Sequence, residues 1–174
     1  MMKSFVLGAM VVGFAAFGAT AALADSDYEY GKQLPALIKS IPQAKVPLAD
    51  GIKDAEKGGK AISAQYEVDE GNFQLSVFVS KGSDIEETIV DYATGAIKKS
   101  DKLVDPDDIK DAKKQVDAMS KAKKSLADAV AAAVQANPGY QAIRVVPRAS
   151  GGKASAAVTL LKGSQTKKVT ESLD

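Results

Sequence analysis

The chain has 174 residues, with 23 basic and 22 acidic side chains and neither cysteine nor histidine. The lack of cysteine excludes disulfides and thiolate metal sites, and the lack of histidine removes the usual general base and the commonest ligand of transition metals. A net charge of +1 gives no long-range field that would steer nucleic acid or an anionic membrane to the protein.

Residues 1–24 have the layout of a secretory signal peptide. Lys3 precedes the apolar stretch 5–21, and Ala22-Leu23-Ala24 forms a small-x-small cleavage site. The alternative is a retained membrane anchor, but a stable span needs roughly 20 strongly apolar residues, and this stretch is short and diluted by Ala and Gly. Loss of Lys3 lowers the basic count from 23 to 22, equal to the acidic count. We expect a neutral mature protein, periplasmic or secreted, without stable insertion into a membrane.

Two helices are expected before the first strand. The polar segment 25–33 predicts no regular element, whereas apolar residues recur at helical spacing over 34–41, and Pro42 stops this helix. A second helix starts near Pro47 and ends at Gly58-Gly59, where glycine adopts the left-handed conformation at low cost.

The hydrophobic period then changes to two, which predicts strands. Residues 62–68 and 73–79 alternate apolar and polar side chains around an Asp-Glu-Gly-Asn turn, a pattern typical of a hairpin with one buried face. In this hairpin Leu75 is expected to face the core, and Ser76 the opposite side. Two further strands are expected at 86–91 and 96–98.

The second half follows the same plan. Asp105-Pro106-Asp107-Asp108 starts a helix and places acids in its first turn, where the helix dipole favours them. Ser125 and Asp128 resemble a capping box that opens a helix over 126–136, which is apolar nearly all round and therefore expected to be buried. Three strands are expected to follow, at 140–147, 153–161 and 166–172.

An internal repeat explains this shared plan. The pattern Ala-Lys-x-x-Leu-Ala-Asp begins at Ala44 and again at Ala122, an offset of 78, and Lys-Gly-Ser begins at Lys81 and again at Lys162, an offset of 81. We therefore divide the chain into a signal peptide (1–24), a first unit (25–104) and a second unit (105–174). Each unit has an α+β plan, with helices followed by an antiparallel β-meander. Because each half would bury only a modest core, the units are expected to share a sheet or an interface.

The order of elements over 48–98 resembles the PepSY domain. In that family a short helix ends at a glycine, here Gly59, alternating strands follow, and an Asp-x-x-Thr-Gly turn closes the unit, here Asp91, Thr94 and Gly95. The second unit keeps the helix, the glycine and the strands but lacks the closing turn, and is a degenerate copy. The resemblance implies an exported protein of PepSY, cystatin-like fold. It also implies an association with peptidase inhibition or regulation, although some members occur in membrane or sensory proteins.

The closing turn also invites a catalytic interpretation. An aspartic protease needs a contiguous Asp-Thr-Gly on each of two loops, whereas here two residues separate Asp91 from Thr94 and there is one such loop. A hairpin turn is the preferred interpretation, with Asp91 accepting backbone N–H bonds and Gly95 at positive φ. These three residues are therefore assigned a structural role.

Other patterns give no catalytic site. Ser120 and Lys123 have the Ser-x-x-Lys spacing, but the partner motifs of penicillin-binding enzymes are absent from the sequence. The lysines around 110–124 alternate with aspartates, which is typical of a solvent face, the alternative being a docking surface for an acidic partner. Carboxylates could bind Ca²⁺, yet 105–108 lacks the EF-hand spacing. No catalytic, cofactor-binding or metal-binding residue is nominated.

Two functions remain open from the sequence. The first is an exported, non-catalytic binding or regulatory module that engages another extracytoplasmic protein, such as a peptidase, through a sheet face or edge strand. The alternative is a sensor that binds a small ligand or cation between the two units, since interfaces between repeats form clefts. No cofactor and no nucleic-acid partner is expected.

Overall fold

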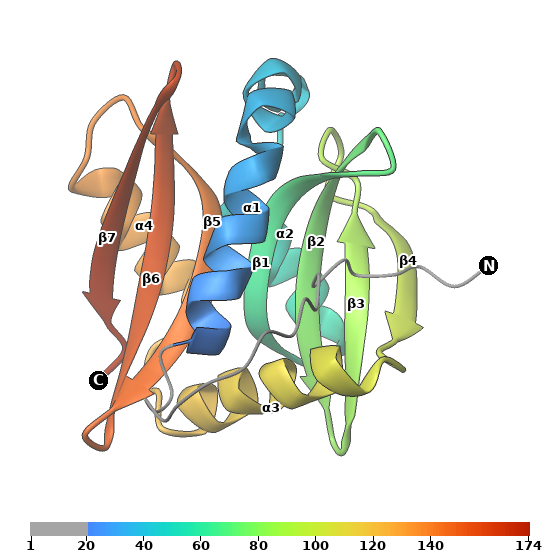
Figure 1. The fold of residues 1–174 in the computed structure, drawn as a ribbon, viewed down its shortest axis with the longest axis vertical. Helices are drawn as coiled ribbons and strands as arrows, with labels where there is room; N and C mark the ends of the chain where they lie inside the picture. The colour runs from blue at the N-terminus through green and yellow to red at the C-terminus, as the bar shows by residue number, and fades with distance from the viewer. Residues whose placement is uncertain (1–20) are drawn as a thin grey trace.

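All seven strands of the described residues lie in one antiparallel sheet, in the order β4-β3-β2-β1-β5-β6-β7. The computed structural model describes residues 21–174 (Figure 1). The first half contributes α1 (Ala21–Ser40), a 3-10 turn (Ile41–Gln43), α2 (Leu48–Ala55), a second 3-10 turn (Glu56–Gly58), β1 (Lys60–Asp69), β2 (Asn72–Lys81), β3 (Asp84–Val90) and β4 (Ile97–Lys102). The second half contributes α3 (Pro106–Ser120), α4 (Leu126–Gln135), β5 (Gln141–Ser150), β6 (Lys153–Lys162) and β7 (Gln165–Ser172). The α+β plan of helices and β-meanders is confirmed.

The two meanders join through a very short seam between β1 and β5. The paired residues in this seam are Ala64 with Val145 and Gln65 with Arg144. Ala64 and Val145 are 81 positions apart, which is the offset of the Lys-Gly-Ser repeat in the strand regions. They are therefore equivalent residues of the two units as well as pairing partners. A local twofold axis therefore passes through this pair, and the expected shared sheet is present.

The registers of the two meanders coincide at the same offset. Leu75 pairs with Val90 between β2 and β3, and Ala156 pairs with Glu171 between β6 and β7. Both first strands also shift register at the equivalent place, between Ala61 and Ser63 in β1 and between Ala142 and Arg144 in β5. The repeat is thus a repeat of strand pairing as well as of residues.

The same backbone anchor closes each unit. In the first unit, the Lys45 N–H donates to the Tyr92 carbonyl at 2.8 Å. In the second, the Lys123 N–H donates to the Leu173 carbonyl at 2.7 Å. Each bond ties the segment before α2 or α4 to the end of the third strand of its meander, which fixes the helix over the sheet.

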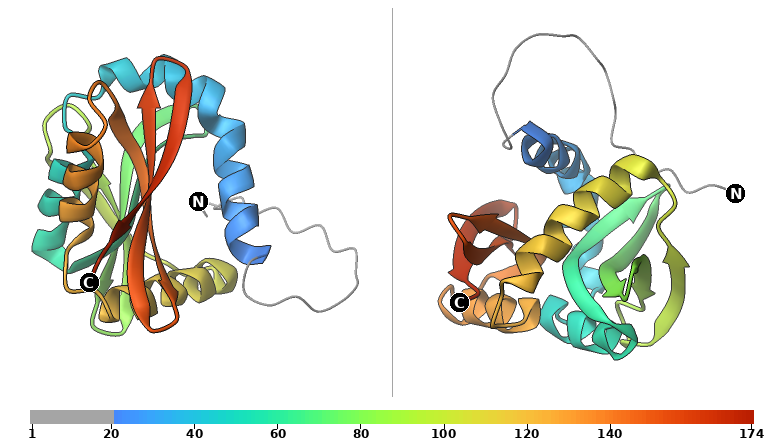
Figure 2. Two further views of the ribbon diagram at one scale, coloured as in Figure 1. Left: turned by 90° about the vertical axis from the view of Figure 1, so that its left-hand side faces the viewer. Right: turned by 90° about the horizontal axis from the view of Figure 1, so that it is seen from below.

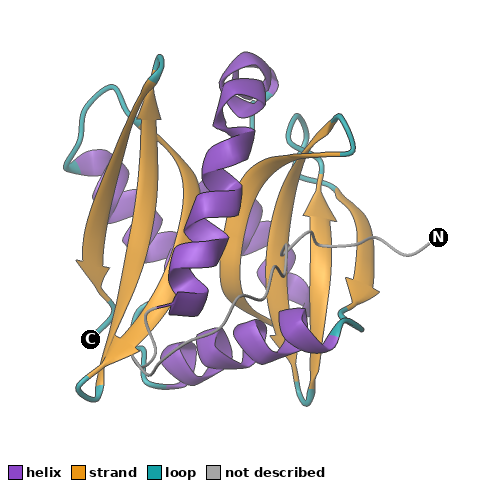
Figure 3. Cartoon of the chain, viewed as in Figure 1, coloured by secondary structure: helices purple, strands orange, loops and turns teal. Residues whose placement is uncertain are grey.

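Helices cover both faces of the sheet, which gives three layers (Figures 2 and 3). Helices α2 and α4 cover one face, which we call the apolar face because its strands carry Leu75, Val77, Val145 and Val158. Helices α1 and α3 cross the other face. We call this second face the polar face. It carries Ser63, Gln65, Glu67, Ser76 and Arg144.

The core lies between the apolar face and its two helices. The capping box at Ser125 and Asp128 is present and opens α4 as predicted. Burial of the apolar side chains here, at about 25 cal/mol per Å², is the main stabilising contribution in a chain without disulfides. The largest fully buried side chains from these two helices and the facing strands include Leu48, Ile52, Leu75, Val77, Leu126 and Leu160.

Helix α1 is longer than predicted. It includes the segment 25–33, for which no regular element was predicted, and Pro35 lies in its interior. Tertiary contacts outweigh the polar composition, because Tyr30 and Gln33 direct their polar atoms to the backbone of the sheet. The predicted signal peptide lies outside the described residues except for 21–24, the first residues of α1. No helix among the described residues is long and apolar enough to cross a bilayer.

The expectation of one buried face in the first hairpin is wrong. Ser76 is as completely buried as Leu75, each with no exposed surface. The reason is that α1 and α3 cover the polar face of the sheet centre, so the alternation of side chains separates an apolar layer from a polar layer rather than core from solvent.

Candidate functional site

A cavity of about 710 Å³ lies between α3 and the polar face of the sheet. Its floor is contributed by both units: Ser63 and Gln65 of β1, Phe78 of β2, and Arg144 and Arg148 of β5. Helix α3 forms its wall. Pockets of this size are typical of small-molecule sites, and they occur where substructures meet.

Strand geometry brings these residues together. Successive side chains on a strand point to opposite faces, so Arg144, Val146 and Arg148 share the polar face. The cross-strand pair of Gln65 with Arg144 places the two units side by side at the floor. The Ser63 hydroxyl donates to the Gln115 side-chain carbonyl at 2.8 Å, which ties α3 to β1 beside the cavity.

A buried carboxylate adjoins the floor. Glu67 is 4% exposed, and its Oε2 accepts a hydrogen bond of 2.6 Å from Gln65 Nε2. Its Oε1 accepts from Gln74 Nε2 at 2.7 Å and from the Ser76 hydroxyl. A buried charge is costly unless hydrogen-bonded, and these three neutral donors stabilise the carboxylate. This network holds the Gln65 side chain in one orientation where it lines the cavity.

Helix α1 closes the floor at the end where β1 and β5 separate. The Tyr30 hydroxyl donates to the Tyr66 carbonyl at 2.9 Å and to the Ile143 carbonyl at 3.1 Å, one on each strand. The Arg144 guanidinium lies 4.7 Å from the centre of the Tyr30 ring, a cation–π contact. Burial raises the pKa of Tyr30 well above its usual range, so the phenol stays protonated and donating.

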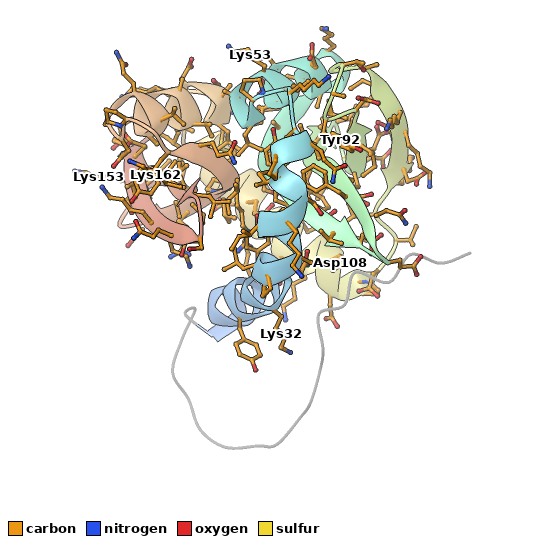
Figure 4. All side chains as sticks on the ribbon, turned by 90° about the horizontal axis from the view of Figure 1, so that it is seen from above. Lys32, Lys53, Tyr92, Asp108, Lys153 and Lys162 are labelled. Atoms are coloured by element: carbon orange, nitrogen blue, oxygen red, sulfur yellow. The ribbon has the colours of Figure 1, made fainter. Side chains whose placement is uncertain are left out.

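The wall of the cavity carries acids at the start of α3. Asp105 caps the helix, because its Oδ1 accepts the N–H groups of Asp107 at 2.9 Å and Asp108 at 3.3 Å. Asp108 lines the cavity, and Figure 4 shows it on the α1 side of the sheet, opposite Lys53. Partial burial, with smaller contributions from the neighbouring aspartates, raises the pKa of Asp108 to about 6.

The closing turn of the first unit lies apart from the cavity. Asp91 Oδ1 accepts the N–H groups of Ala93 at 2.8 Å and Thr94 at 2.9 Å, and Gly95 has φ of +79°. Lys98 forms an ion pair with Asp91 at 2.9 Å, and this contact is the largest of the effects that lower the pKa of Asp91 to about 2. Asp91, Thr94 and Gly95 have the geometry of a hydrogen-bonded turn.

The remaining motifs are also placed by the structure. Ser120 is the last residue of α3, and its hydroxyl donates to the Asp117 carbonyl at 2.7 Å. Lys114 pairs with Asp111 at 2.6 Å and Lys121 with Asp117 at 2.7 Å, which are the local pairs that the lysine spacing predicts for a solvent face. Among the side chains that the structure describes, no group of three or more acidic residues could hold a metal ion.

Sequence reasoning allowed for a cleft between the two units but assigned to it none of the residues that line this cavity. A signal was present in the strand predicted at 140–147, where Arg144 interrupts the apolar run 142–147, and Arg148 follows on the same face of the strand. A charged residue on a strand that is covered on both faces marks a polar interior or a ligand site.

Comparisons with known proteins leave the family open. No protein-family model matches the chain, and no curated protein matches it. Among solved structures, a candidate lipoprotein from Clostridium difficile 630 is similar, with 16% sequence identity and a TM-score of 0.39. The alignment covers 75% of this chain and 88% of that one. A similarity at this level establishes neither the fold family nor a function, and the PepSY resemblance stays a prediction.

Proposed function

We propose that the protein is an exported, non-catalytic binding module that holds a small molecule in the cavity between its two units. The observation that carries the proposal is the cavity itself, because its floor is shared by β1 and β2 of one unit and β5 of the other. Such a site exists only when both units are folded together, so a ligand there would stabilise the whole chain.

The two edge strands of the sheet favour a small ligand over a partner protein that would pair with a sheet edge. The edge strand β4 carries Lys98, Lys99 and Lys102, and the edge strand β7 carries Lys167 and Lys168. Lysines on an edge strand oppose pairing with another chain. A peptidase partner, which the PepSY resemblance implies, would therefore have to use a surface other than these edges.

The experiment is a thermal-shift screen of the mature chain against small molecules. A ligand at 100 times its dissociation constant should raise the free energy of unfolding by about 2.7 kcal/mol. Ile109 is a half-buried residue of α3 that lines the cavity, so Ile109→Trp should fill the space and remove the response. Lys53→Trp, on the opposite side of the molecule, is the matched control and should leave the response unchanged. Stabilisation that persists in Ile109→Trp would place the ligand elsewhere and contradict the proposal.

A further inference from the structure

Two glutamine side chains line the cavity from different sides. Gln65 belongs to β1 in the floor, and Gln115 belongs to α3 in the wall. Gln115 is bonded to Ser63, which lies on the same face of β1 as Gln65 and about 6.6 Å from it along the strand. The two glutamines are therefore near neighbours across the space between the sheet and the helix.

The protein holds one end of each amide group. Gln65 Nε2 donates to the buried Glu67 carboxylate at 2.6 Å, and because an ionised carboxylate only accepts, this bond fixes the orientation of the amide. Gln115 Oε1 accepts the Ser63 hydroxyl at 2.8 Å. These bonds leave the opposite end of each amide for another partner, namely Gln65 Oε1 and Gln115 Nε2.

The other end of each amide is open. Gln65 Oε1 accepts no hydrogen bond from the residues that the structure describes, and Gln115 Nε2 donates none to them. Neither atom is sealed in the interior without a partner, so both are accessible. Because both side chains line the cavity, it presents one acceptor from its floor and one donor from its wall. Their fixed orientations reduce the entropy that a ligand would lose on binding.

A secondary amide is complementary to this pair. Its C=O accepts and its N–H donates, and in the trans form the two groups point to opposite edges of one plane. A ligand amide between the sheet and the helix can therefore accept from Gln115 and donate to Gln65 in one pose. An ester keeps the carbonyl but leaves Gln65 Oε1 without a donor, and an alcohol carries its donor and acceptor on a single atom.

We propose that the cavity binds an uncharged ligand through a secondary amide, the group that a short peptide backbone carries. This inference rests on the proposed function and specifies its ligand class. The ligand carbonyl accepts from Gln115 Nε2, and the ligand N–H donates to Gln65 Oε1. The groups on either side of the amide extend over the apolar part of the lining, which includes Phe78, Val146 and Ile109.

The test compares N-butylpentanamide with butyl pentanoate by titration calorimetry of the full mature chain. The two probes have equal chain lengths, and the ester has an acceptor oxygen in place of the N–H donor. The amide should bind at least about tenfold more tightly, because loss of the N–H leaves Gln65 Oε1 unsatisfied. Gln65→Leu should bring the two affinities together, since the floor then has no acceptor for the N–H.

Gln115→Glu separates a ligand contact from a structural role. Glutamate keeps an oxygen that accepts from Ser63, so the tie between α3 and β1 survives, but it places a second oxygen where Nε2 donated. The affinity for both probes should fall about tenfold at unchanged thermal stability. This variant keeps the test decisive if the lost donor to Glu67 prevents Gln65→Leu from folding. Lys53→Gln, on the opposite side of the molecule, is the control and should change neither affinity.

Four results would overturn the ligand class. They are an ester that binds as tightly as the amide, a preference for the amide that persists in Gln65→Leu, affinities that are unchanged in Gln115→Glu, and no binding of either probe. The proposed function fails separately, because it requires only that some compound of the thermal-shift screen stabilises the wild type and that Ile109→Trp removes the effect. Such a compound would leave the proposed function standing whatever the two probes do.

Discussion

Gly51 of α2 lies directly against Leu75 of β2. A Cβ added at Gly51 would lie 3.4 Å from Leu75 Cγ and closer still to Cδ2, inside van der Waals contact. The repeat places Ala129 and Ala156 at the equivalent positions of the second unit, at offsets of 78 and 81, and both are buried. The two units thus fill the same space differently: the first with no side chain on the helix and a leucine on the strand, the second with two alanines.

Gly51→Ala should destabilise the protein by about 1–3 kcal/mol, the usual cost of overpacking a filled core, although alanine is the better helix former. In the background of Leu75→Ala, which alone costs about 2–5 kcal/mol, the same change should be nearly neutral. Urea unfolding of the double-mutant cycle measures this coupling. Gly31→Ala in α1 is the control, because a Cβ there meets nothing within 4 Å, and it should stabilise slightly. Additive effects of the two core changes would contradict the predicted contact.

Ser76→Ala should cost about 1–3 kcal/mol, although Ser76 is small and sits on the polar face. The change removes a fully buried donor to the Glu67 carboxylate and leaves that buried charge with one donor fewer. Ser150→Ala, at the exposed end of β5, should cost little in the same chemical unfolding assay. Equal effects at the two serines would mean that the Glu67 network contributes nothing to stability.

Asp91 should titrate at a pH well below that of an ordinary aspartate. Its pKa is about 2 in the folded protein and roughly 3.9 when unfolded, so its ionised form contributes stability that is complete above about pH 4 and lost as the pH falls towards 2. The difference in stability between wild type and Asp91→Asn should therefore be constant near neutral pH and vanish near pH 2. Carboxyl-resolved NMR should also show that Lys98→Met raises the pKa of Asp91. An unchanged pKa in Lys98→Met would contradict the role of the ion pair.

Asp108 should have the opposite effect on stability. Its pKa is about 6 in the folded protein and roughly 3.9 when unfolded, so between about pH 4 and pH 6 the folded state holds a proton that the unfolded state has released. The protonated form of Asp108 therefore contributes stability that is complete below about pH 4 and is lost as the pH rises through 6. Asp108→Asn should match wild type near pH 3.5 and exceed it at pH 7 by on the order of 1 kcal/mol, after discounting for partial exposure. Parallel stability curves for the two proteins would contradict this.

The local parts of this fold could be predicted from sequence, and the tertiary parts could not. The capping box at Ser125 and the turn at Gly95 depend on bonds within a few residues, which composition and spacing reveal. The N-terminal half of α1 depends on Tyr30, whose hydroxyl partners lie 36 and 113 residues away. No local pattern encodes such contacts.

The residues of the candidate site could not be named from the sequence for the same reason. Ser76 and Arg144 lie on a face that is covered by α1 and α3, and a period of two does not say whether a polar face meets water or another layer. The cavity also requires β1 of the first unit to pair with β5 of the second. The sequence pattern does not specify this pairing, which the structure shows at Ala64 and Val145.

The twofold axis through Ala64 and Val145 has a consequence for how the polar face could diversify. Two identical subunits related by such an axis would repeat every side chain, so that an acid on one side would require the same acid on the other. Because one chain encodes both halves, each position can change alone. Glu67 of the first half corresponds to Arg148 of the second at the offset of 81, and Ser63 corresponds to Arg144. Because the two halves are joined in one chain, one side of the axis can hold the buried hydrogen-bond network of Glu67, while the other side places arginines on the floor of the cavity.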